Sequence, residues 1–195
     1  MTADHDHGYK LLFSQPQMVR DLLTGFVDEE WVERLDLDTL ERVSGSYVAE
    51  DLRDREDDIV WRVRWGEDWL YVYLLLEFQS RVERFMAVRI MGYVGLLYQD
   101  LVRQQALTAN GLLPPVLPIV LYNGEKRWRA PTDIESLIER VPGGLERYRP
   151  RCRYLLLDEG AIVADEQWSL EARNVVGALF RLEYSRDEQE LLAVL

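Results

Sequence analysis

The stretch that decides the fold is REDDIVWRVRWGEDWLYVYLLLEFQS, which runs from Arg55 to Ser80. Its first half alternates with a period of two, and this pattern predicts a β-strand. One face of that strand carries Ile59, Trp61, Val63 and Trp65, and the other carries Asp58, Val60, Arg62 and Arg64. The alternation therefore assigns Asp58 and Ile59 to opposite faces of a sheet.

A hairpin follows directly. Gly66 and Glu67 suit a two-residue turn. The return segment from Leu70 to Phe78 is apolar at nearly every position, which is typical of a central strand buried on both faces. It nevertheless ends in Glu77, Phe78 and Gln79, so a carboxylate closes a buried strand.

The turn length sets the register of this hairpin. With two residues in the turn, position 65 pairs with 68 and position 58 pairs with 75. Glu77 is then the diagonal neighbour of Asp58 on the same face, roughly 7 to 8 Å away at Cα. A turn with an odd number of residues would place the two acids on opposite faces.

Two neighbouring carboxylates admit two interpretations. In the first, Asp58 caps a turn and Glu77 pairs with one of the many arginines. In the second, both acids bind a hard divalent cation such as Mg²⁺, which one or two carboxylates, waters and phosphate oxygens can hold. The cation would offset the cost of burying two like charges.

Four stretches of the chain resemble the recombination-promoting nuclease and putative transposase family, a branch of the PD-(D/E)XK phosphodiesterases. They occur in the family's order and span most of residues 5 to 158. The stretches are HDHGYKLLFSQPQMVRDLLTGFV from His5, SYVAEDLRDREDDIVWRV from Ser46, LLLEFQSRVERFMAVRIMGYV from Leu74 and LPPVLPIVLYNGEKRWRAP from Leu113.

The resemblance implies roles for three residues. It makes Asp58 and Glu77 the metal ligands, for Mg²⁺ or Mn²⁺, and Gln79 the third member of the motif. Most members of the superfamily carry lysine where this chain has Gln79. An amide donates hydrogen bonds but brings no charge, so the electrophilic role of that lysine stays open. Lys10, one of only two lysines, is an alternative source, and a surface salt bridge is its other explanation.

Three further residues are accessory candidates. His5 aligns with the family's leading histidine, although a histidine near a chain end is commonly solvated. Glu50 resembles an acid that precedes the motif aspartate, and its alternative is a surface carboxylate at a strand end. Arg55 could bind phosphate or pair with Glu50 or Asp54.

The remaining elements are predicted from periodicity and capping. We expect a helix over 16–24, capped by Ser14 and Gln17 and ended by Gly25. A strand is expected near 46–50, an amphipathic helix over 83–105, a strand over 116–122, a short helix capped by Thr132 with Glu135, and a strand over 154–157. The long helix should bury Phe85, Val88, Ile90, Met91, Val94, Leu97, Leu101 and Val102.

The fold class is therefore α/β. The order helix, three strands, helix, strand is that of the restriction-endonuclease-like PD-(D/E)XK core, a central mixed sheet flanked by helices. We expect a nuclease-like domain over 1–160 and a helical extension over 161–195 that packs on the core or on a partner in a homodimer.

Composition limits the setting of the protein. A chain of 195 residues that is 48% hydrophobic can build one proper core. The start is polar and the apolar runs are short, so we expect no signal peptide and no membrane partner. Cys152 is the only cysteine, which fits a reducing cytoplasm and excludes an internal disulfide.

The charge of −12 is the main argument against nucleic acid, because DNA binding rests on phosphate neutralisation. Arginines cluster locally, and arginine favours bidentate phosphate contacts, although solvated surface is an alternative for each cluster. The clusters are Arg81, Arg84 and Arg89; Lys126, Arg127 and Arg129; and Arg147, Arg149, Arg151 and Arg153.

These observations predict a metal-dependent DNA endonuclease, a hydrolase related to recombination and transposition nucleases. The alternative is a weak or inactive module that keeps the fold and binds DNA or a protein. The acidic pair favours catalysis, whereas the charge and Gln79 favour the module.

Overall fold

The computed structural model describes residues 8–43, 58–77, 82–124, 126–164 and 174–184. Within these residues the chain forms a five-stranded sheet in the order β1-β2-β3-β4-β5. The strands are β1 (Leu35–Arg42), β2 (Asp58–Trp65), β3 (Asp68–Glu77), β4 (Val116–Tyr122) and β5 (Leu155–Asp158). Pairing is antiparallel from β1 to β3 and parallel from β3 to β5, so the sheet is mixed.

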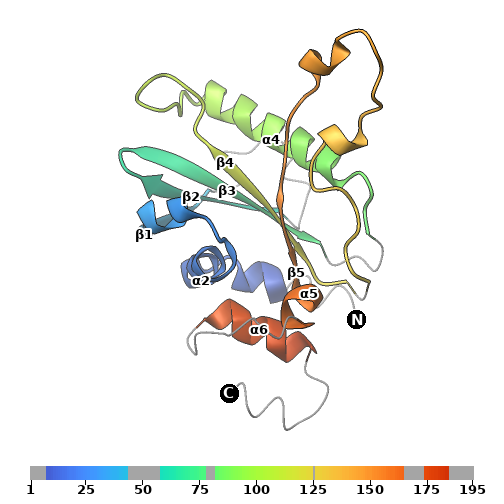
Figure 1. Cartoon of the computed structure of the whole chain (residues 1–195). Coiled ribbons are helices and arrows are strands. Elements are labelled where there is room, and N and C mark those ends of the chain that lie inside the picture. Colours follow the sequence, from blue (N-terminus) through green and yellow to red (C-terminus); the bar gives the residue numbers. More distant parts are fainter. Residues whose placement is uncertain (1–7, 44–57, 78–81, 125, 165–173, 185–195) are drawn as a thin grey trace.

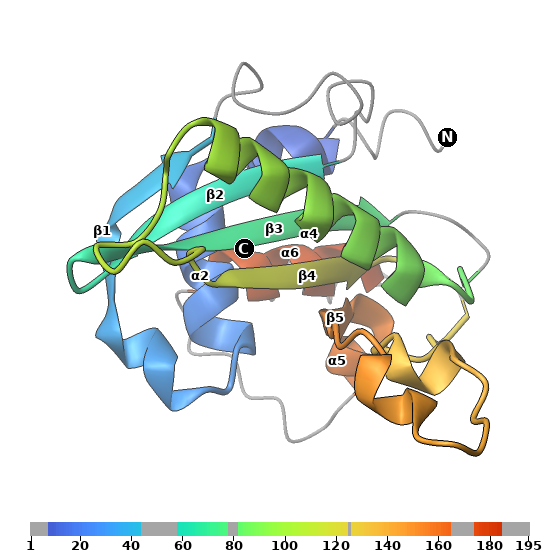
Figure 2. The ribbon, with the colours of Figure 1, turned by 90° about the horizontal axis from the view of Figure 1, so that it is seen from above.

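Helices cover both faces of this sheet, as Figures 1 and 2 show. One face packs against α2 (Pro16–Phe26) and α6 (Val175–Tyr184), and the other against α4 (Met86–Arg103). The short helix α5 (Glu159–Ala164) follows β5, and 3-10 turns occupy η1 (Glu30–Arg34), η3 (Glu135–Leu137) and η4 (Leu145–Tyr148). The expected α/β class with a mixed sheet between helices is confirmed.

The β2–β3 hairpin has the register that the two-residue turn predicts. Trp65 pairs with Asp68, and Gly66 adopts a φ of +62°, which glycine reaches without strain. Trp61 is fully buried and its indole N–H donates to the carbonyl of Phe13 at 3.1 Å. The alternation assigned to β2 is also observed, because Ile59 and Val60 belong to hydrophobic clusters on opposite faces.

The first helix begins at Pro16, as expected, but its capping and its end differ from the expectation. Gln15 is the N-cap residue of α2 and makes no capping hydrogen bond with its side chain. The Ser14 hydroxyl instead donates to the carbonyl of Lys10, and the Gln17 amide donates to Asp21. The predicted capping box is therefore wrong. The helix also continues through Gly25 to Phe26, and Gly25 packs closely against Asn174.

The long helix α4 is shorter than predicted, and part of its predicted inner face is exposed. Phe85, Val88 and Val102 are 50%, 43% and 55% exposed. The buried positions recur every three or four residues, and they are Met86, Ala87, Ile90, Tyr93, Leu97, Asp100 and Leu101. Hydrophobicity alone overestimated the stripe that contacts the sheet, because α4 turns Val88 and Val102 towards solvent and Phe85 precedes the helix as its N-cap residue.

Two further expectations concern short elements. Thr132 does not cap the turn at η3, where the Asp133 carboxylate accepts the backbone N–H of Ser136 at 2.9 Å. The strand expected near 46–50 lies outside the described residues. Strand β1, in which Leu35 and Leu37 alternate with two aspartates, was not predicted from the sequence.

The last described helix packs on the core. Val176 and Phe180 of α6 are fully buried, and Asp21 of α2 accepts the backbone N–H of Val175 at 2.7 Å. The boundary between 160 and 161 stays a prediction, as does a homodimer.

Candidate nuclease site and its surroundings

Asp58 and Glu77 stand at the same end of the central hairpin. Asp58 is the first residue of β2 and pairs with Leu75, and Glu77 is the last residue of β3. Position 77 lies two positions beyond 75, so the backbone register places positions 58 and 77 on one face. That face is shared by Val60 of β2, which packs in the cluster under α4.

The parallel strands bring further polar residues to this end of the sheet. Glu77 pairs with Tyr122 of β4, and Tyr122 pairs with Asp158 of β5. Asn123 directly follows β4, and Glu159 directly follows β5. The carboxyl ends of parallel strands are where α/β sheets commonly bind ligands. This edge of the sheet therefore collects acids and an amide from three consecutive parallel strands.

A buried polar cluster joins this edge to the N-terminal segment. Tyr9, in a helical turn over residues 8–12, donates its hydroxyl hydrogen to Glu159 at 3.0 Å. Asn123 donates its amide hydrogen to the Tyr9 oxygen at 3.3 Å. Glu159 is fully buried, and its second oxygen has no hydrogen-bond partner within the described structure.

The surroundings raise the pKa of Glu159 to about 8. Burial is the main cause, the nearby Glu183 and Asp158 carboxylates add to it, and the hydrogen bond from Tyr9 acts in the opposite direction. Burial and Glu159 also raise the pKa of the Tyr9 hydroxyl. The cluster can therefore hold a proton at neutral pH in the interior of the protein.

Asp158 stabilises the neighbouring loop. Its carboxylate accepts the Trp128 backbone N–H at 2.8 Å and pairs with Arg127 at 3.1 Å. A Cβ on Gly160 would lie 2.0 Å from the Arg127 guanidinium, so a side chain at this position would displace that arginine. These contacts fix the segment that leaves β4 against the end of β5.

The other predicted site residues fare differently. Lys10 lies in the same helical turn as Tyr9 and is half-buried. His5, Glu50, Arg55 and Gln79 lie outside the described residues. Among the residues that are described, no three His, Cys, Asp or Glu side chains gather into an ion site.

Cys152 is half-buried, and burial raises the pKa of its thiol, which does not favour a nucleophile.

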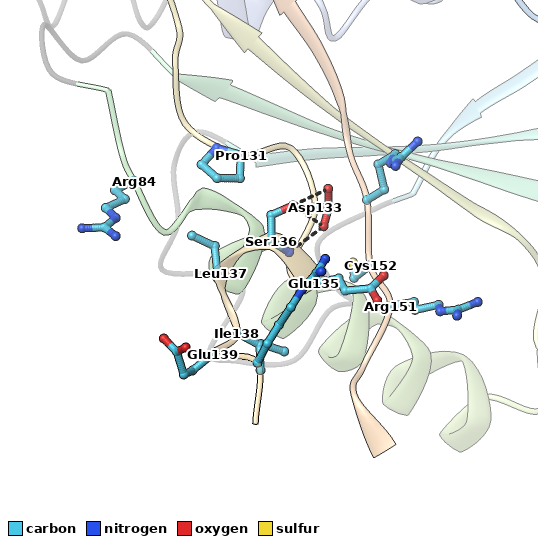
Figure 3. Close-up of a pocket in the computed structure, with 12 residues that line it drawn as sticks. Arg84, Pro131, Asp133, Glu135, Ser136, Leu137, Ile138, Glu139, Arg151 and Cys152 are labelled. Atoms are coloured by element: carbon cyan, nitrogen blue, oxygen red, sulfur yellow. Dashed lines mark hydrogen bonds between the residues drawn. The ribbon is translucent and has the colours of Figure 1, made fainter. Parts of the chain in front are cut away.

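A polar hollow of about 1100 Å³ lies beside this end of the molecule. Figure 3 shows Arg84 and Arg151 on either side of the residues of η3, which also line the hollow. The hollow contains four arginines in all, Arg84, Arg140, Arg151 and Arg153. The acids Asp133, Glu135 and Glu139 also line it.

A family model described as "Putative transposase, YhgA-like" matches residues 3–195, nearly the whole chain. The chain belongs to this family. Several relatives of the chain are named recombination-promoting nucleases. The family assignment made from the sequence is confirmed.

Among these relatives, recombination-promoting nuclease RpnD of Escherichia coli O157:H7 is 33% identical over 64% of this chain and 47% of its own length. Recombination-promoting nuclease RpnA of E. coli K12 is 32% identical over 63% of this chain and 41% of its own length. The chain thus spans less than half the length of these two relatives. A protein of E. coli K12 named "Putative inactive recombination-promoting nuclease-like protein YjiP" is 37% identical over 47% of this chain and 89% of its own length.

No solved structure matches this chain. Within the described part of the chain, none of the helices combines the length and apolar character that a membrane crossing requires.

Sequence reasoning missed Tyr9, Asn123 and Glu159 as a group. Lys10 rather than Tyr9 was the predicted site residue of the N-terminal stretch, and Asn123 was not among the predicted site residues. One signal was available, because Asn123 and Glu159 each follow a predicted parallel strand, and such positions meet at one edge.

Proposed function

We propose that this protein is a Mg²⁺- or Mn²⁺-dependent endonuclease that hydrolyses phosphodiester bonds of DNA on a PD-(D/E)XK-type fold. The observation that carries the proposal is the hairpin register, which puts Asp58 and Glu77 on one sheet face at one end of two central strands. Membership in a family whose relatives are named nucleases supports it.

The donor set fits a hard cation. Two carboxylates are a sufficient protein contribution to a Mg²⁺ site that also uses water and phosphate oxygens. We assign Asp58 and Glu77 as the ligands. A bound divalent ion would supply a water of lowered pKa and neutralise charge on the reacting phosphate.

The remaining roles belong to residues of this chain. Gln79 would donate hydrogen bonds that orient the attacking water or a phosphate oxygen, but an amide cannot supply the positive charge of a lysine. Lys10, His5, Glu50 and Arg55 are accessory candidates, and Lys10 shares its helical turn with the buried Tyr9. We place this activity in a reducing cytoplasm, in DNA recombination or mobility.

The test is cleavage of supercoiled plasmid at low salt with Mg²⁺, Mn²⁺, Ca²⁺ or EDTA. Wild-type protein should nick the plasmid in Mg²⁺ or Mn²⁺ and leave it intact in EDTA. We expect Asp58→Ala to slow nicking on the order of a thousandfold, because a catalytic metal contributes several kcal/mol to the barrier. The matched control is Asp36→Ala, which removes an exposed aspartate of β1 and should leave the rate unchanged.

A specific observation favours a second candidate, a non-catalytic module that binds DNA or protein. Gln79 replaces the superfamily's lysine, and two relatives in E. coli K12 carry the word "inactive" in their names, one at 37% and one at 30% identity. Wild-type protein that neither cleaves DNA nor binds a divalent ion in calorimetry would sink the nuclease proposal and leave this module.

A further inference from the structure

The charge of the chain is unevenly distributed. The segment from Lys126 to Arg153 carries eight basic and four acidic residues, a formal charge of +4. Because the whole chain has a charge of −12, the residues outside this segment carry a charge of −16. This segment links β4 to β5 and extends beyond the sheet at the end where β3 and β4 finish (Figures 1 and 2). A local positive field thus stands out on an acidic protein.

Most of these basic side chains reach the surface. All except the half-buried Arg149 are exposed, namely Lys126, Arg127, Arg129, Arg140, Arg147, Arg151 and Arg153. Arg84, which precedes α4, is also exposed and joins three of them around the hollow. Exposed guanidinium groups are suited to bidentate contacts with phosphate.

Neighbouring acids engage only some of these charges. The Asp133 carboxylate is occupied by the backbone N–H and the hydroxyl of Ser136, and these bonds, with help from Arg153, lower its pKa. Arg127 is paired with Asp158. Within the described residues, Arg84, Arg140 and Arg151 make no salt bridge, so their guanidinium groups are available to a ligand.

We propose that the 126–153 segment, together with Arg84, is a binding surface for the phosphate backbone of DNA. The inference rests on the proposed function in one respect, that the DNA bound here is the substrate of the Asp58 and Glu77 site. It explains how a protein of charge −12 can approach a polyanion, which net charge alone opposes.

The spacing suits one bound duplex. Arg84 follows Glu77 by seven residues, so their Cα atoms lie at most about 25 Å apart, less than one DNA turn of about 34 Å. Arg153 precedes Asp158, at the carboxyl end of β5, by five residues of extended chain, or about 17 Å. Both arginines are therefore within reach of a single DNA turn from this end of the sheet.

The experiment measures DNA affinity by fluorescence anisotropy in EDTA, across a series of salt concentrations, with a labelled duplex that the protein cannot cleave under these conditions. Arg151→Ala with Arg153→Ala should weaken binding about tenfold or more at low salt. The slope of log Kobs against log salt should become shallower by about two, one for each lost phosphate contact. Thermal unfolding verifies that the variant is folded.

Arg34→Ala with Arg42→Ala is the matched control, because it removes two exposed positive charges from η1 and β1. Affinity and salt slope close to wild type are expected. Equal losses in both double variants, or an unchanged slope after loss of Arg151 and Arg153, would overturn the inference. Absence of DNA binding by wild-type protein at low salt would overturn it as well.

Failure of this inference is distinguishable from failure of the nuclease proposal. Arginine-dependent binding without metal-dependent cleavage would remove the nuclease and support the surface. Metal-dependent cleavage with the same KM in wild type and the Arg151 and Arg153 variant would support the nuclease and remove the surface.

Discussion

Glu159 is the residue whose environment departs furthest from that of an ordinary carboxyl group. It is fully buried, one oxygen accepts a hydrogen bond from Tyr9, and its pKa is raised to about 8. The usual pKa of the free side chain is near 4.5. Between these two values the folded protein binds a proton that the unfolded chain has released.

This difference predicts a pH-dependent stability. The folded state binds more protons from about pH 4.5 to about pH 8, so the free energy of unfolding should fall as pH rises through this window. Glu159→Gln keeps a neutral group at every pH. We expect its stability to decline less over this window, with a relative gain on the order of a few kcal/mol near pH 8. Urea unfolding at several pH values measures the difference.

Glu146→Gln, which changes an exposed glutamate on η4, is the control for this prediction. Its unfolding free energy should follow the wild-type pH profile. Parallel profiles for Glu159→Gln and wild type would show that Glu159 titrates normally.

The packing of α6 against α2 depends on a few polar contacts as well as on buried side chains. Asp21 accepts hydrogen bonds from the Gln17 amide and from the Val175 backbone N–H, at the start of α6. Asn174 donates to the Asp21 carbonyl at 2.9 Å, and its own oxygen accepts the Gly177 N–H. An aspartate of one helix thus caps another helix far along the chain.

Asp21→Ala should therefore destabilise the protein. The substitution leaves a helix-start N–H without its acceptor, which costs about 1 to 2 kcal/mol in the free energy of unfolding. Urea unfolding measures the change, and Asp36→Ala, on an exposed position of β1, should change it by less than about 0.5 kcal/mol. Equal effects of the two variants would contradict a capping role for Asp21.

Elements differed in how far they could be predicted. The β2–β3 hairpin and β4 follow from local signals, namely side-chain periodicity and the turn residue Gly66. The strand β1 was missed because its alternating aspartates lower the β-propensity of LDLDTLER. The face of α4 was predicted only in part, because which apolar positions contact the sheet depends on how the helix is rotated against it.

The whole molecule carries a net charge of −12, and salt should act on its stability and on its DNA binding in opposite ways. Self-repulsion between exposed acids disfavours the compact state and is screened by salt. Attraction between the basic segment 126–153 and DNA is also screened by salt, so binding weakens.

We expect NaCl raised from about 0.01 M to about 0.15 M to increase the melting temperature by a few degrees. Calorimetry or circular dichroism measures this shift, and KCl should reproduce it, since screening depends on ionic strength. A melting temperature that falls or stays constant would show that local ion pairs outweigh the net repulsion.

Local patterns in the amino-acid order were enough to predict the central hairpin, the register of Asp58 and Glu77 and the strand at 116–122. These features depend on turn length and side-chain alternation, which act between residues close in the chain. The Tyr9, Asn123 and Glu159 cluster joins residues 114 and 150 positions apart. The basic segment acquires its place beside the site only when β4 and β5 pair. Contacts of this kind arise from packing of the whole chain, and no local period encodes them.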